Sequence, residues 1–87
     1  MDLYQLELRL LSALVRDRHV VAAALTEGFH PDLLSLPLAR RLVRVVLDLH
    51  SAPATVLDEP ALRARLVDRG LASAEMDRFV ADVLQTP

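Results

Sequence analysis

The stretch "PLARRLVRVVLDLH", residues 37–50, carries the clearest helical pattern in this sequence. Its apolar residues recur at the spacing of one helix face, and its charged residues fall mostly on the other. Pro37 suits the first position of a helix, where a missing N–H costs nothing. We therefore predict a helix from Pro37 to about His50. Its buried side holds Leu38, Leu42, Val45, Val46 and Leu49, its solvent side holds Arg41, Arg44 and Asp48, and Arg40 lies on the boundary.

Capping residues place two helices before this one. Asp2 can cap a first helix that runs to about Arg16. Asp17 can cap a second, short helix that ends before Gly28, a residue suited to the left-handed position just past a helix end. Pro31 then opens a short helical turn.

Similar signals place two helices after it. "SAPAT", residues 51–55, is predicted to be a loop, and Pro60 opens a fourth helix that Gly70 closes. Ser73 caps a last helix with apolar residues at helical spacing. The candidate caps of the fourth helix are Thr55, Asp58 and Glu59.

Composition favours helices around one small core. Apolar residues make up 53% of the 87 residues and aromatic residues only 3%. Leu, Val and Ala dominate, which suits packed helices better than strands. No strand pattern is present. We expect an all-α fold, a compact orthogonal bundle of about five to six short helices that forms a single domain over residues 1–87.

Charge and cysteine content narrow the function classes. The net charge is −2 and every basic residue is an arginine, whereas a protein that grips phosphate backbones unaided is expected to be strongly basic. The absence of cysteine excludes disulfides and thiolate metal sites. No apolar run approaches the roughly 20 residues of a membrane span, and no basic segment of a signal peptide opens the chain. We expect a cytoplasmic protein without membrane contact or direct nucleic-acid binding.

A glutamate opens the leucine-rich stretch "ELRLLSAL", residues 7–14. In helical projection Glu7 falls between Leu11 and Leu14, on the apolar face. A carboxylate there is costly unless it is paired, hydrogen-bonded or at an interface. Arg40 can cover the core with its stem and reach such a carboxylate with its guanidinium. The sequence predicts a structural ion pair between Glu7 and Arg40; the alternative is a Glu7 that lies at an interface or reaches water.

Leucines cluster around the two prolines that precede the long helix, and arginines follow them. They offer more aliphatic surface than a short turn can hide, and exposed aliphatic surface often marks a partner contact. The alternatives are that the leucines close the bundle, and that the arginines form a solvated face in which Arg44 pairs with Asp48. The candidate partner surface consists of Leu33, Leu34, Leu36, Leu38, Arg41 and Arg44.

Residues with catalytic or metal-binding chemistry are scattered along the chain. The three histidines fall in different segments without the spacing of a metal site, and His50 is placed to interact with the last carbonyls of its helix. Asp58 and Glu59 are explained as caps, and Ser12 falls on the polar side of its helix without a nearby base. No Gly-rich phosphate-binding motif occurs. We expect no enzyme activity and no catalytic, cofactor-binding or metal site.

Short motifs also follow one another in a recognisable order. The first is a glutamate, two variable residues, an aliphatic pair, a small residue and another aliphatic residue: Glu7, Leu10, Leu11, Ser12 and Leu14. An acidic residue near Phe29, then Arg40 in a long amphipathic helix, come next. A short helix led by an aspartate and a last helix ending near "LQTP" follow. This order resembles the N-terminal domain of the DnaB-type replicative helicases, over nearly the whole chain.

The resemblance implies self-association within a ring collar, as a dimer or higher oligomer, and docking of primase or a helicase loader. The helicase-binding domain of DnaG-type bacterial primases shares the pattern and is the alternative; a small helical DNA-binding regulator is an alternative of another class. Two departures stand out. Gly28 interrupts the acidic–Phe step, and the long helical hairpin of both families is not reached. We therefore expect a fragment of a longer replication protein or a small stand-alone relative.

Overall fold

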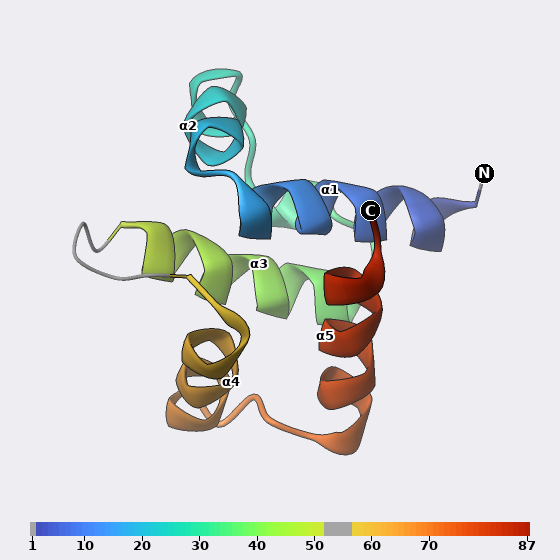
Figure 1. Ribbon diagram of the computed structural model, residues 1–87. Helices are drawn as coiled ribbons and strands as arrows, with labels where there is room; N and C mark the ends of the chain where they lie inside the picture. Colours follow the sequence, from blue (N-terminus) through green and yellow to red (C-terminus); the bar gives the residue numbers. More distant parts are fainter. Residues whose placement is uncertain (1, 52–56) are drawn as a thin grey trace.

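Five α-helices and one 3-10 turn form the part of the chain that the computed structural model describes, residues 2–51 and 57–87 (Figure 1). The all-α bundle expected from the sequence is confirmed. The elements in chain order are α1 (Leu3–Arg16), α2 (Arg18–Thr26), the 3-10 turn η1 (Pro31–Leu33), α3 (Pro37–His50), α4 (Glu59–Asp68) and α5 (Ala74–Gln85).

The predicted caps set the beginnings of the helices. The Asp2 carboxylate accepts a hydrogen bond from the Gln5 amide at 2.8 Å, and the Ser73 hydroxyl accepts one from the Met76 amide at 3.0 Å. Of the three candidate caps for α4, Asp58 takes the role and accepts from the amide of Ala61 at 2.9 Å. The candidate Thr55 and most of the predicted 51–55 loop lie outside the described residues.

Two glycines end helices with the same motif. Gly28 and Gly70 have φ angles of 89° and 69°, a left-handed conformation that glycine adopts without strain. After each of them an apolar residue donates its amide to a carbonyl five residues back, Phe29 to Ala24 and Leu71 to Leu66, both at 2.9 Å. The two apolar residues pack against the core, so each motif also turns the chain back toward it.

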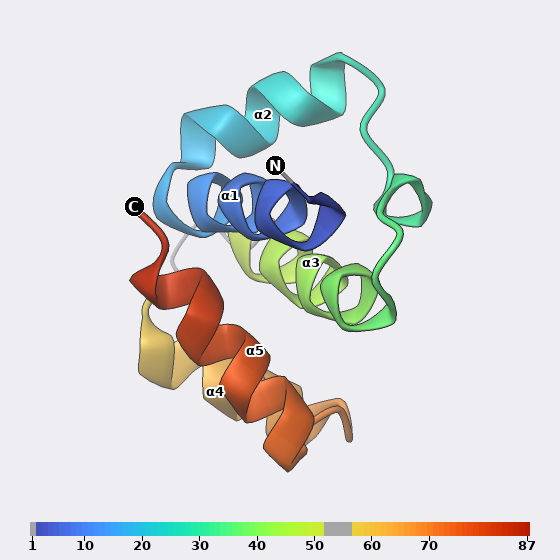
Figure 2. The same ribbon diagram turned by 90° about the vertical axis from the view of Figure 1, so that its right-hand side faces the viewer.

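Helix α3 is the centre of the bundle. It contacts α1 and α2 on one side and α4 and α5 on the other, and η1 packs against it as well. Figure 1 shows α1 and α3 across the middle of the molecule, α2 above them, and α4 and α5 below. In the perpendicular view α2 still lies outside α1, on the side away from α4 and α5 (Figure 2).

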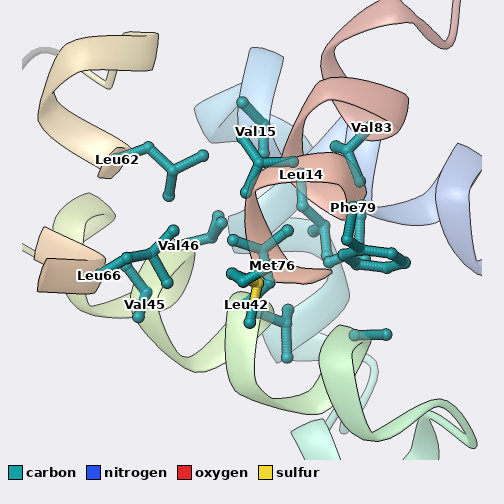
Figure 3. Close-up of a cluster of buried hydrophobic side chains, with 14 of the residues drawn as sticks. Leu14, Val15, Leu42, Val45, Val46, Leu62, Leu66, Met76, Phe79 and Val83 are labelled. Atoms are coloured by element: carbon teal, nitrogen blue, oxygen red, sulfur yellow. The ribbon is translucent and has the colours of Figure 1, made fainter. Parts of the chain in front are cut away.

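The core is one cluster to which every α-helix contributes. Of the predicted buried side of α3, Leu42, Val45, Val46 and Leu49 are buried, and Leu38 is half-buried. Opposite α3, α4 supplies two leucines and α5 supplies a methionine, a phenylalanine and two valines (Figure 3). Helix α2 contributes least, because Val21 is its only buried residue. The labelled core residues in Figure 3 are Leu14, Val15, Leu42, Val45, Val46, Leu62, Leu66, Met76, Phe79 and Val83.

Candidate interaction surface

Glu7 is buried, with only 3% of its surface exposed, as its place on the apolar face of α1 predicts. Its partners are backbone groups of the segment that leads into α3. Oε1 accepts hydrogen bonds from the amides of Ser35 at 2.9 Å and Leu36 at 3.0 Å, and Oε2 accepts from Ser35 at 3.1 Å. Bonds from amides to a charged carboxylate are strong, and the nearby N-terminus of α3 favours a negative charge. These contacts tie α1 to the start of α3.

The predicted ion pair between Glu7 and Arg40 is wrong. Among the described residues no salt bridge joins them; Arg40 instead donates from Nη1 to the carbonyls of Leu34 and Ser35, each at 3.0 Å. The backbone between η1 and α3 is not helical, so its amides and carbonyls need other partners. Glu7 satisfies the amides and Arg40 the carbonyls. We call this arrangement of Glu7, Arg40 and residues 34–36 the junction.

Arg44 also binds this region rather than its own helix. Its Nη2 lies 2.9 Å from the Asp32 carboxylate, which attaches η1 to α3. The expected pair between Arg44 and Asp48 is therefore replaced. Asp48 instead accepts from Arg65 at 2.8 Å and Arg69 at 2.7 Å, which joins α3 to α4. Pairs between elements replace a pair within one helix, because η1 and α4 bring suitable charges to α3.

The structure divides the candidate partner surface. Leu33 has 69% of its surface exposed, and Arg41 and Arg44 are also exposed. Leu34 belongs to the core, and Leu36 and Leu38 are half-buried against it. The predicted exposure is therefore wrong for Leu34 and too high for Leu36 and Leu38, because the junction turns this segment toward the core.

Two further exposed leucines lie on α1 and are not part of the candidate partner surface predicted from the sequence. Leu3 has 49% and Leu6 56% of its surface exposed. Leu6 immediately precedes Glu7, and Leu33 is two residues before Ser35, which binds Glu7. Exposed leucines therefore come from both chain segments that meet at the junction. The apolar face of this part of α1 is therefore wider than its neighbours cover.

Helices α1 and α5 are joined by polar bonds as well as by the core. Ser12 is buried, not on a solvent face as expected, and its hydroxyl donates to the carbonyl of Thr86 at 2.8 Å. The Tyr4 hydroxyl donates to Asp82 at 2.7 Å. This hydrogen bond raises the pKa of Tyr4 above its ordinary 10.0, and burial and the negative charge of Asp82 act in the same direction.

His50 binds α1 rather than the last carbonyls of its own helix. Its Nε2 lies 2.8 Å from the carbonyl oxygen of Leu14, and its Nδ1 is buried without a hydrogen-bond partner among the described residues. His19 and His30 are exposed and lie in other elements. Within residues 2–51 and 57–87, no three metal-binding side chains come together as a candidate metal site.

Three arginines in α4 and at its C-terminal cap are engaged in ion pairs. Arg63 lies 3.2 Å from Glu59 and 3.3 Å from Asp77, while Arg65 and Arg69 share Asp48. Each guanidinium faces a carboxylate of this chain, so the helix presents little unpaired positive charge to a phosphate backbone.

No protein-family model matches this chain, and neither a curated protein nor a solved structure gives a match. In the described part of the chain, every helix is too short or too polar to cross a membrane.

Proposed function

We propose that this chain is a cytoplasmic protein-interaction domain of the bacterial DNA replication machinery, acting by contact rather than by catalysis. A role in protein–protein contact is supported by the exposed leucines around the junction. These are Leu3 and Leu6 from α1 and Leu33 from η1. Exposed apolar side chains on a rigid support are typical of binding surfaces.

The junction supplies that rigidity. Glu7 and Arg40 hold residues 34–36 through five hydrogen bonds of 2.9–3.1 Å. A surface ordered before binding loses less conformational entropy when a partner docks. The leucines would supply affinity, and the surrounding charges would set the orientation of the partner.

The proposed role in replication rests on the order of sequence motifs, which resembles that of the helicase N-terminal domain. In the structure two motif residues have defined roles: Glu7 anchors α3, and Ser12 anchors the end of α5. By analogy with the helicase collar, the partners would be further copies of this chain and a primase or loader. If the chain is the primase-side domain instead, its partner would be the helicase.

A calorimetric titration tests this proposal. The chain is titrated with the helicase-binding domain of the primase from the same organism and, separately, with the helicase N-terminal domain, while light scattering reports the oligomeric state of each component. We expect saturable binding to one of the two. Binding to neither, or salt-sensitive binding to duplex DNA in their place, would contradict the proposal.

Two substitutions test whether the exposed leucines form the contact. Leu6→Ser and Leu33→Ser should weaken the contact, since both side chains are exposed. Val67→Ser is the matched control, because Val67 on α4 is 64% exposed and lies on another element. An equal loss of binding in all three variants would mean that the contact does not use the leucines near the junction.

A further inference from the structure

The proposed function does not specify the chemistry of the partner. The surface around Leu33 indicates what that chemistry would be. Leu33 is the most exposed of the large apolar residues in the described part of the chain. Its neighbours in sequence are both held by α3, Asp32 through Arg44 at 2.9 Å and the Leu34 carbonyl through Arg40 at 3.0 Å. The backbone of Leu33 is thus fixed on both sides while its side chain faces solvent.

Arginines of α3 hold the segment that contains Leu33. Arg40 and Arg44 are one helical turn apart on α3, and both contact the segment that contains Leu33. Arg41 lies between them in sequence, is exposed, and forms no ion pair or side-chain hydrogen bond among the described residues. We call Leu33, Arg40 and Arg41 the Leu33 patch.

Neither arginine of the patch forms a salt bridge within the described residues. Arg40 uses one of its nitrogens, Nη1, and binds carbonyl oxygens, which leaves its positive charge without a salt-bridge partner. Arg41 has no carboxylate partner in the described chain, and Asp32 is already engaged by Arg44. On α4, by contrast, the arginines face carboxylates of their own protein. The Leu33 patch is therefore a positive, partly apolar surface on a chain whose net charge is −2.

We propose that the Leu33 patch binds an acidic amphipathic segment of a partner protein. An aliphatic or aromatic side chain of that segment would pack on Leu33, and flanking carboxylates would bind the guanidinium groups of Arg41 and Arg40. Planar guanidinium groups bind carboxylates through paired hydrogen bonds, and opposite charges speed and orient docking. This inference rests on the proposed function, because it specifies the kind of partner that a contact domain would accept.

Two synthetic peptides provide the probe. Both carry leucines at helical spacing; one has glutamates and the other lysines at the flanking positions. NMR spectra of the isotope-labelled chain are recorded as each peptide is added. We expect saturable binding of the glutamate peptide, with shift changes concentrated over residues 32–44, and no saturable binding of the lysine peptide.

Charge and apolar contact are then separated by variants. Arg41→Glu should weaken binding of the glutamate peptide by roughly tenfold or more, whereas Arg78→Glu, at another exposed arginine on α5, should leave it unchanged. Leu33→Ser should weaken binding, and Val67→Ser should not. If Arg41→Glu disturbs the fold by circular dichroism, Arg41→Gln replaces it and should give a smaller loss.

Several results would overturn the inference. One is the absence of binding by the glutamate peptide, and another is equal binding of both peptides. A third is peptide binding that depends on Arg41 but is unchanged by Leu33→Ser, together with equally tight binding of a single-stranded DNA oligonucleotide. That combination would indicate a general site for polyanions. A chain that still binds the primase or helicase domain with unchanged affinity after Arg41→Glu would overturn this inference while leaving the proposed function in place.

Discussion

Glu7 and Arg40 bind opposite polar groups of the same stretch of backbone without binding each other. The carboxylate accepts from the amides of Ser35 and Leu36, and the guanidinium donates to the carbonyls of Leu34 and Ser35. The Glu7 carboxylate is thereby satisfied by backbone amides, so a glutamate on the apolar face of α1 is tolerated. The junction also closes a loop between positions that are 28 apart in sequence.

Glu7→Gln should lower the free energy of unfolding by about 1–3 kcal/mol. The amide oxygen of glutamine can still accept, but its NH2 group would face backbone donors and the charge would be lost. Chemical denaturation measures the effect. Glu27→Gln is the control, because Glu27 is exposed at the end of α2 and should change stability by less than about 0.5 kcal/mol. An unchanged midpoint and slope for Glu7→Gln would show that the junction contributes little.

Asp48→Asn should loosen α4 from α3. Asp48 accepts from Arg65 and Arg69, and both bonds are partly exposed, so we expect a loss of only about 0.5–1.5 kcal/mol. Added salt should reduce the difference between the variant and the natural chain, since it screens these charges. Denaturation at low and high salt checks this, with the exposed Asp68→Asn as the control. A difference that does not respond to salt would argue against an ionic origin.

The single tyrosine should titrate at an unusually high pH. Asp82 raises the pKa of Tyr4 above 10.0, so the contribution of this contact to stability is present below pH 10.0 and is lost as the pH rises through the higher pKa of the folded state. The tyrosinate absorbance measures the titration directly. Asp82→Asn should move its midpoint down toward 10.0, while Asp68→Asn should not. Identical midpoints in all three proteins would rule out the hydrogen bond to Asp82 as the cause.

His50 should carry its proton on Nε2 when neutral. A carbonyl oxygen can only accept, so the contact with Leu14 requires an N–H at that nitrogen. Nitrogen NMR of the imidazole distinguishes the two tautomers. His50→Ala should also lower stability by roughly 1–2 kcal/mol, whereas His19→Ala, at an exposed position, should not. A neutral His50 protonated at Nδ1 would contradict the bond to α1.

The helices were predictable because their signals are local. The bounds of α3, the caps Asp2 and Ser73, and the helix ends at Gly28 and Gly70 depend on residues within a few positions of each other. The burial of Glu7 was predictable for the same reason, since helical projection fixes the side of α1 on which it lies.

The partners were not predictable, because they depend on which elements meet. Backbone amides satisfy Glu7, and every residue except proline has one, so no residue type could identify them. Arg44 had a suitable aspartate four residues away, yet the fold offered Asp32 instead. Ser12 has a polar side chain and was assigned to solvent, but α5 covers that side of α1. Of the candidate surface, Leu33, Arg41 and Arg44 are exposed, whereas Leu34 is buried in the core.

The bonds between α1 and α5 have a consequence for the order in which the chain folds. Ser12 binds Thr86, which is 74 positions later in the chain, and Tyr4 binds Asp82, which is 78 positions later. The ribosome therefore releases α1 well before α5 is synthesised. Until then, α1 can pack only against α2 and α3, and part of its apolar face stays open. Closing so long a loop is also the slower kind of step in folding. Docking of α5 is thus the event that completes the core, and a nascent chain halted before α5 would expose the leucines of α1 to chaperones or to aggregation.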